Sequence, residues 1–234
     1  LADIVDNSIY AKASKIDIRT SYQPLRISIL DNGHGMNETK LDEALTYNAK
    51  DPREPREPGD LGRFGLGLKI ASLSQGKKLI VVTSQDGHAT AGIWDQEHVD
   101  EVNRWVALYP DNPRSIRHGT GSEDEQLGAN GTLVVWENME DVYGNFKEFN
   151  ESTNAARDHL GLIFHRFLSG ESGLDQCSIT IDGASLEPFD PFHSKHKATQ
   201  REPQEPEKVS EDVYLQVFTL PHRDLAGEEK ASKA

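Results

Sequence analysis

The chain has 234 residues, with 25 lysines and arginines against 39 aspartates and glutamates, so its formal net charge is −14. That length suits one large domain, or one domain with part of a second. The acidic balance argues against a broad nucleic-acid-binding face, which needs basic side chains to neutralise phosphates. No apolar run exceeds five residues, which is too short to span a bilayer. Cys177 is the only cysteine, which excludes an intrachain disulfide, and we expect a cytoplasmic protein.

The first half of the chain alternates helical and strand patterns. Apolar residues recur at helical spacing from Leu1 to Ile9 with no capping residue before them, so we expect a domain that is truncated at its N-terminus. Alternating isoleucines predict two strands, and Asn37 is a good N-cap for a helix that reaches Leu45. In order, we expect a helix at 1–10, strands at 15–20 and 25–30, a helix at 37–45, a Pro-rich loop at 48–61 and a hairpin of strands 78–84 and 89–95.

The second half is less regular. Residues 95–130 do not distinguish a short helix from irregular loop. The patterns then predict a strand at 132–137, a helix at 151–169 and a strand at 178–181. Residues 193–212 are rich in Lys, Gln, Glu and Pro and indicate a flexible excursion, followed by a strand at 213–220.

Three short segments carry polar residues and glycines in patterns that occur at ligand-binding sites. Asp3, Asn7 and Tyr10 share one face of the first helix, where they are either a solvated surface or a site for a water and a cation. The segment 31–36 (DNGHGM) follows a strand, so its Asp either forms an ordinary Asx turn or accepts a hydrogen bond from an exocyclic amine.

The third segment, 62–69 (GRFGLGLK), places glycines in front of a helix, as in many anion-binding sites. It is not a P-loop, because Lys69 comes one position late and Ile70 replaces the Ser or Thr. A dinucleotide fingerprint is also excluded, because a Pro-rich loop precedes the glycines instead of a strand. The segment is therefore either another kind of phosphate-binding loop or a flexible joint.

These segments, taken in order with Gly131-Thr132, resemble the ATP-binding domain of the GHKL family. That family includes gyrase B, MutL, the 90-kDa heat-shock chaperone, sensor histidine kinases and MORC proteins. The sequences of the motifs are most similar to those of MORC-like and related bacterial members. The resemblance covers residues 1–137. It implies an α+β fold of the Bergerat type, a two-layer sandwich of a mixed sheet with helices on one face. Residues 1–145 would form this domain, and 146–234 would begin a second, transducer-like α/β domain.

The resemblance also implies roles for single residues, with ATP and Mg²⁺ as the cofactors. Asn7 would hold the metal, Asp31 would bind the adenine amine, and Asp3 would orient the attacking water. The loop 48–61 would be the ATP lid. The expected nucleotide-contacting residues are Asn7, Asp31, Gly33, Gly35, Met36, Gly62, Arg63, Phe64, Gly65, Leu66, Gly67, Lys69 and Thr132.

Two departures from the family pattern concern turnover more than binding. Asp3 stands where the family usually has a Glu base, and Tyr10 stands where several relatives have an Asp. We expect Mg²⁺-dependent ATP binding and slow hydrolysis used as a conformational switch, with an ATP-dependent homodimer in the full-length protein. The alternatives are a non-hydrolysing nucleotide-gated interaction module and, less favoured, a histidine-kinase catalytic domain. Nucleic acid could bind through domains outside this stretch, whose acidic composition does not support such binding.

Overall fold

The computed structural model describes residues 1–45, 68, 72, 74–119, 127–139, 143–171, 173–211 and 213–222. Its elements are α1 (Ala2–Tyr10), β1 (Lys15–Tyr22), β2 (Leu25–Asp31), α2 (Glu38–Leu45), β3 (Gly76–Gln85), β4 (His88–Asp95), α4 (Gln96–Val102), the 3₁₀ turn η1 (Pro113–Ser115), β5 (Gly131–Met139), α5 (Phe146–Ile163), α6 (His165–Leu168), β6 (Ser178–Ile181), β7 (Ala184–Ser185), β8 (Gln200–Ser210) and β9 (Val213–Thr219).

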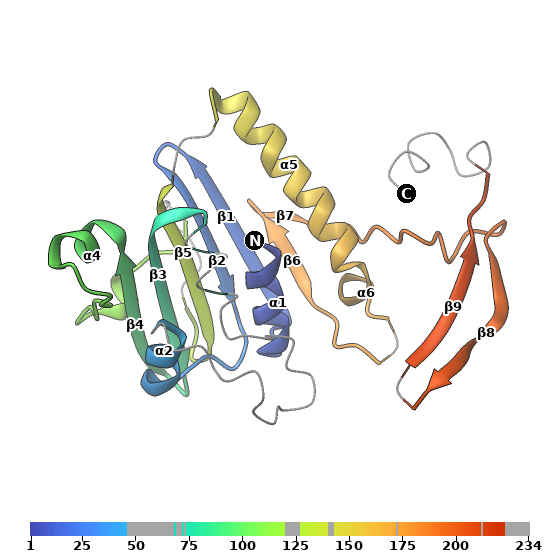
Figure 1. The fold of residues 1–234 in the computed structure, drawn as a ribbon, viewed down its shortest axis with the longest axis horizontal. Helices are drawn as coiled ribbons and strands as arrows, with labels where there is room; N and C mark the ends of the chain where they lie inside the picture. Colours follow the sequence, from blue (N-terminus) through green and yellow to red (C-terminus); the bar gives the residue numbers. More distant parts are fainter. Residues whose placement is uncertain are drawn as a thin grey trace.

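A seven-stranded mixed sheet in the order β4-β3-β5-β2-β1-β6-β7 forms the body of the molecule (Figure 1). The pairs β1–β2, β2–β5, β3–β5 and β3–β4 are antiparallel, whereas β6 runs parallel to β1. Residue 31 closes the β1–β2 ladder opposite Ile16 and also pairs with Thr132 of β5. The sheet therefore brings the end of β2 against the start of β5.

Each face of the sheet has its own apolar cluster, because successive side chains of a strand point to opposite sides. Helices α1, α2 and α5 cover one face, where Ile4, Leu41 and Leu160 pack against alternate strand residues such as Ile29. The next residue, Leu30, belongs to the cluster on the other face. The predicted α+β two-layer arrangement, with helices on one face of a mixed sheet, is confirmed.

The segment around the 3₁₀ turn η1, which follows the short helix α4, covers part of the second face. Arg26 of β2 donates to the carbonyl oxygens of Arg117 and Gly119 at 2.5 and 2.7 Å, and Gly119 N–H donates to Ser28 Oγ at 3.1 Å. His118 Nε2 lies 3.1 Å from Asp17 Oδ2, and both side chains are buried. The stretch 95–130, where the sequence pattern was undecided, thus contains the short helix α4 and this covering segment.

Most of the expected elements are present, with two differences. The long helix begins at Phe146 instead of 151, because Asn145 caps it by accepting from Glu148 N–H at 3.1 Å, and it ends at Ile163 before the separate turn α6. The expected flexible excursion at 193–212 was wrong over its second part, which is strand β8. Prolines are tolerated there because β8 pairs on one side only, with β9, and its register shifts between Glu202 and Glu207.

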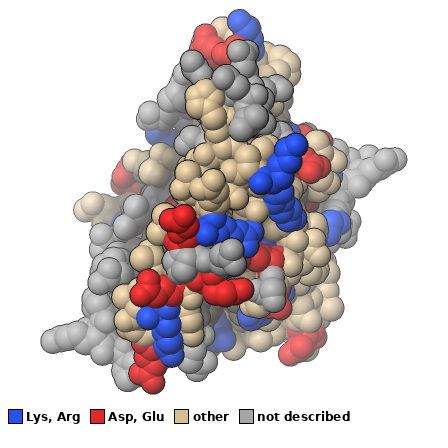
Figure 2. Space-filling view, turned by 90° about the vertical axis from the view of Figure 1, so that its right-hand side faces the viewer, with Lys and Arg blue, Asp and Glu red and all other residues tan. Residues whose placement is uncertain are grey.

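Strands β8 and β9 form a separate two-stranded sheet, which lies to the right of the seven-stranded sheet in Figure 1. Val213, Leu215 and Val217 are all exposed on one face of β9. Viewed from this side, the molecule shows basic and acidic side chains interspersed (Figure 2). Among the described helices, none has the length and hydropathy needed to cross a membrane.

Candidate functional site

The candidate site is built around Asp31, the last residue of β2, which lies at the edge of the helix-covered core. Asp31 is only 7% exposed, and the described groups that donate hydrogen bonds to it are all uncharged. Its Oδ1 accepts from Gly33 N–H at 2.8 Å and from Thr132 N–H at 3.2 Å, and its Oδ2 accepts from Ser8 Oγ at 2.9 Å. The carboxylate thereby joins α1, the loop after β2 and the start of β5.

The environment of Asp31 shifts its acidity. Burial raises the pKa of Asp31 above its usual value, and hydrogen bonds from Gly33, Ser8 and Thr132 offset only part of that effect. A carboxylate oxygen has two acceptor positions, and the described donors fill both on Oδ1 but only one on Oδ2, where Ser8 binds. This group can accept one further hydrogen bond from a ligand.

The loop after β2 packs against the sheet with no room for side chains at its two glycines. A Cβ on Gly33 would lie 2.7 Å from the carbonyl oxygen of Ala11, and one on Gly35 would lie 1.9 Å from that of Ser84. Gly35 also has a φ of +68°, which L residues other than glycine rarely adopt. Both glycines are therefore required for the backbone to lie this close to α1 and β3.

Two threonines on neighbouring strands connect this loop to the sheet through hydrogen bonds. Thr83 of β3 pairs with Thr132 of β5 in the ladder, and their hydroxyl oxygens lie 3.2 Å apart. Thr83 Oγ1 accepts from Met36 N–H at 2.8 Å and also donates to the carbonyl oxygen of Gly131 at 3.1 Å. The loop, β3 and β5 are thus joined through one buried hydroxyl group.

Helix α1 presents its polar residues on two sides. Ser8 is buried and reaches Asp31, whereas Asp3 and Asn7 are exposed one turn apart. In the described part of the chain, the hydrogen-bond network around Asp31 does not include the side chains of Asp3 or Asn7. Burial, followed by the nearby charge of Asp3, raises the pKa of Asp6 on the same helix.

The structure thus brings together Asp31, Gly33, Gly35, Met36 and Thr132 from the expected set. Asn7 is described but lies on the exposed side of α1, away from these five residues. The remaining members of the set lie outside the described residues, namely Gly62, Arg63, Phe64, Gly65, Leu66, Gly67 and Lys69, as does the expected lid at 48–61.

Sequence reasoning missed two polar residues of this cluster, Ser8 and Thr83. Ser8 occupies a position of the apolar stripe of α1, and Thr83 follows four apolar residues in β3. A hydroxyl group at a position that the pattern assigns to the core is the signal that could have identified both.

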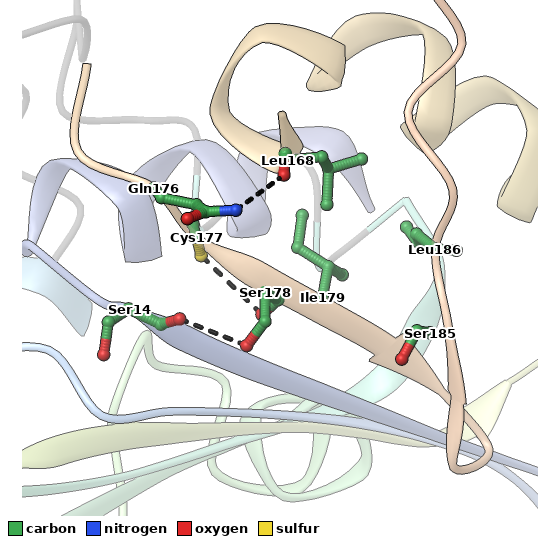
Figure 3. A pocket seen from close by; sticks show the side chains of 8 residues that line it. All are labelled: Ser14, Leu168, Gln176, Cys177, Ser178, Ile179, Ser185 and Leu186. Atoms are coloured by element: carbon green, nitrogen blue, oxygen red, sulfur yellow. Dashed lines mark hydrogen bonds between the residues drawn. The ribbon is translucent and has the colours of Figure 1, made fainter. Parts of the chain in front are cut away.

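A hollow of about 380 Å³ lies between α6, β6 and β7 (Figure 3). Two of the polar side chains that line it already bind the protein: Gln176 donates to the carbonyl oxygen of Leu168, and Ser178 Oγ to that of Ser14, both at 3.2 Å. Burial raises the pKa of the Cys177 thiol to about 11, so this thiol is a poor nucleophile. Among the described residues, the Asp31 cluster is therefore the better candidate for a ligand site.

The mixed sheet with helices on one face, and a buried strand-end Asp followed by a Gly-x-Gly loop, define a Bergerat-type two-layer fold. A family model described as "Histidine kinase-, DNA gyrase B-, and HSP90-like ATPase" matches residues 1–121. Since this match covers more than half of the chain, the chain belongs to that family.

Two mouse proteins show the nature of its relatives. The chain is similar to ATPase MORC2B from Mus musculus, with 30% identity over 112 residues, which is 44% of this chain and 11% of the relative. It is also similar to MORC family CW-type zinc finger protein 3 from Mus musculus, with 25% identity over 114 residues, or 47% and 12% of the two chains. The chain spans about a tenth of the length of these curated relatives. The expected resemblance to GHKL and MORC-like ATPases is confirmed.

Proposed function

We propose that this chain binds ATP together with Mg²⁺, hydrolyses it slowly and uses the bound nucleotide as a conformational switch. The observation that carries the proposal is Asp31, a buried carboxylate with one acceptor position that no described donor fills, in a chain of an ATPase family. An acceptor of this kind suits the exocyclic amine of adenine. Gly33 and Gly35 would let the base approach the backbone, and Thr132 would support the same edge of the base.

The proposed metal site uses Asn7, with Asp3 one turn before it on the exposed side of α1. An amide oxygen beside a carboxylate is a donor pair that suits Mg²⁺, which prefers oxygen ligands. The ion, when bound, neutralises charge on the phosphate oxygens. Asn7 would hold it, while Asp3 would orient the attacking water and accept a proton from it.

The alternative is a nucleotide-gated interaction module without turnover. Asp3 favours it, because an Asp is one methylene shorter than the Glu usual at this position and reaches its water less well. In both versions, nucleotide binding would favour a homodimer of the full-length protein.

The first experiment is calorimetric titration with a non-hydrolysable ATP analogue, with and without Mg²⁺. The purified chain should bind the analogue more tightly with Mg²⁺. Asp31→Ala should weaken binding ten- to hundredfold, because a hydrogen bond to a charged group contributes roughly 1.5–3 kcal/mol. Circular dichroism checks that the variant is folded. Unchanged affinity in a folded Asp31→Ala protein would overturn the assignment of the base pocket.

The second experiment separates hydrolysis from binding. Asp3→Asn should keep the affinity for the analogue and abolish phosphate release. Asp3→Glu should retain or raise the rate of phosphate release. General-base catalysis contributes typically about 10²–10⁴-fold, so the difference lies within reach of a steady-state assay. Equal turnover of the wild type and Asp3→Asn would exclude Asp3 as the base, and the absence of turnover in the wild type would favour the interaction module.

A further inference from the structure

Thr83 is a polar residue in the buried middle of the sheet that the proposed function does not yet use. It is fully buried in β3, after four apolar residues, and its hydroxyl contacts three groups of the Asp31 cluster. These are Met36 N–H at 2.8 Å, the carbonyl oxygen of Gly131 at 3.1 Å and the hydroxyl oxygen of Thr132 at 3.2 Å. All three groups belong to segments that surround the proposed base pocket.

The number of protons limits how this cluster can be arranged. A hydroxyl group donates one hydrogen bond and accepts two. The carbonyl oxygen of Gly131 can only accept and Met36 N–H can only donate, whereas the Thr132 hydroxyl can do either. All the groups are satisfied when Thr83 donates to Gly131 and accepts from both Met36 and Thr132. The proton of Thr132 then points toward Thr83.

We infer that Thr83 is a positioning residue that orients the Thr132 hydroxyl as an acceptor toward the base and so favours 6-amino over 6-oxo purine nucleotides. The inference deepens the proposed ATP site and rests on it. Thr132 is only half-buried, so its hydroxyl is not sealed inside the sheet. Thr132 is the ladder partner of Asp31, so with its proton held by Thr83 its hydroxyl offers lone pairs on the same side of the sheet as the Asp31 carboxylate.

The chemical consequence is discrimination at one position of the purine ring. The 6-amino group of adenine donates hydrogen bonds, whereas the 6-oxo group of hypoxanthine or guanine only accepts them. The oxygen of a 6-oxo group would face two other acceptors, the Asp31 carboxylate and the Thr132 hydroxyl, and would form a hydrogen bond with neither. Sites built for hydrogen bonding strongly disfavour such a ligand. Freed from Thr83, the Thr132 hydroxyl could turn and donate to a 6-oxo group.

The test compares non-hydrolysable analogues of ATP and of inosine triphosphate by calorimetry on the intact chain with Mg²⁺. Thr83→Val keeps the shape of the side chain and removes its hydroxyl, whereas Thr83→Ser keeps the hydroxyl. We expect Thr83→Val to lower the ATP-to-inosine affinity ratio roughly tenfold, which corresponds to one hydrogen bond. Thr83→Ser should restore the ratio to near the wild-type value.

Thr90→Val is the matched control, because Thr90 of β4 is the direct cross-strand partner of Thr83 on the side away from β5. It should leave the ratio unchanged. If Thr83→Val does not fold, Thr83→Ala removes the hydroxyl without adding volume and takes its place.

Three results would overturn the inference. A wild-type ratio in the folded Thr83→Val or Thr83→Ala protein would show that Thr83 does not set the specificity. Equal binding of both analogues by the wild type would show that the site does not distinguish 6-amino from 6-oxo purines, and it would leave the proposed ATP site intact. Binding of neither analogue by the wild type would instead overturn the proposed function itself.

Discussion

Two buried carboxylates on opposite faces of the sheet differ in the donors that surround them. Asp17 receives Arg19 Nε at 2.8 Å and His118 Nε2 at 3.1 Å, together with a hydrogen bond from Thr180. Burial would raise the pKa of Asp17, but the hydrogen bonds from Thr180, Arg19 and His118 outweigh it, so its pKa is lowered. The described donors to Asp31 are all neutral, and burial raises its pKa. Asp17 is thus a structural anion, whereas Asp31 is the carboxylate that we propose binds the ligand.

The raised pKa of Asp31 predicts how nucleotide binding depends on pH. Protonation removes the acceptor that the adenine amine would use, so affinity should fall as the pH drops through the pKa of Asp31. Because that pKa is raised, the loss should begin at a higher pH than for an ordinary Asp, which titrates near about 3.9. The dissociation constant of the ATP analogue, measured by calorimetry from pH 8 to pH 5, tests this expectation.

The control for that series is Asp31→Asn, which cannot titrate at this position. The phosphates of the analogue also titrate in this range, but they do so equally for both proteins. The difference between the two pH profiles therefore isolates the carboxylate. Parallel profiles would mean that Asp31 does not titrate in contact with the ligand.

At the scale of elements, local patterns were sufficient where one face of a strand or helix meets the core. The alternating isoleucines predicted β1 and β2, and the Asn37 cap was confirmed by its hydrogen bond to Lys40 N–H at 2.9 Å. At Asp86-Gly87 both residues have positive φ, as a tight hairpin turn requires. These features depend on neighbours in the sequence, so the sequence alone reveals them.

Features that depend on distant partners were missed. Strand β8 contains two prolines and many charges, and its pairing with β9 is what keeps it extended. Likewise, Ser8 and Thr83 acquire a role only because the fold brings α1, β3 and β5 to the same place. For the candidate site, the sequence located Asp31, Gly33, Gly35, Met36 and Thr132 but not the side chains that hold them in position.

The contact between the Gly-x-Gly loop and the sheet predicts the effect of a single methyl group. Gly35→Ala should be strongly destabilising, because its Cβ would collide with the Ser84 carbonyl and its φ of +68° is unfavourable for alanine. Gly87→Ala is the matched control: its φ is +84°, but nothing lies within 4 Å of its Cβ position. The control should cost about 1–2 kcal/mol, the usual penalty of a left-handed residue.

Urea denaturation measures both changes in the free energy of unfolding. Gly35→Ala should lower the free energy of unfolding clearly more than Gly87→Ala does, and the difference between the two losses measures the collision with β3. It should also weaken binding of the ATP analogue at temperatures where the variant is folded, since the loop carries the base pocket. Equal losses in the two variants would show that the loop adapts and that its close packing is not required.

At the scale of the whole molecule, one sheet connects segments that are far apart in sequence. Strand β6 pairs with β1 in parallel, so residues 178–185 extend the same sheet that carries Asp31. The division of the chain near residue 145 into two domains stays a prediction. The exposed apolar face of β9 belongs to a separate two-stranded sheet, and such sheets are marginally stable by themselves.

Because the site joins α1, β2, β3 and β5, a bound nucleotide should stabilise the whole fold. A ligand at a hundredfold excess over its dissociation constant, bound only to the folded state, adds about 2.7 kcal/mol to the free energy of unfolding. For a chain of this size, 1 kcal/mol shifts the melting temperature by roughly 2–4 °C, so a shift of roughly 5–11 °C is expected. Differential scanning calorimetry with Mg²⁺ and the non-hydrolysable ATP analogue measures it. Asp31→Ala at the same concentrations should show a much smaller shift, and Thr90→Val should show the full one. A full shift in Asp31→Ala would mean that the nucleotide stabilises the chain from somewhere other than the Asp31 cluster.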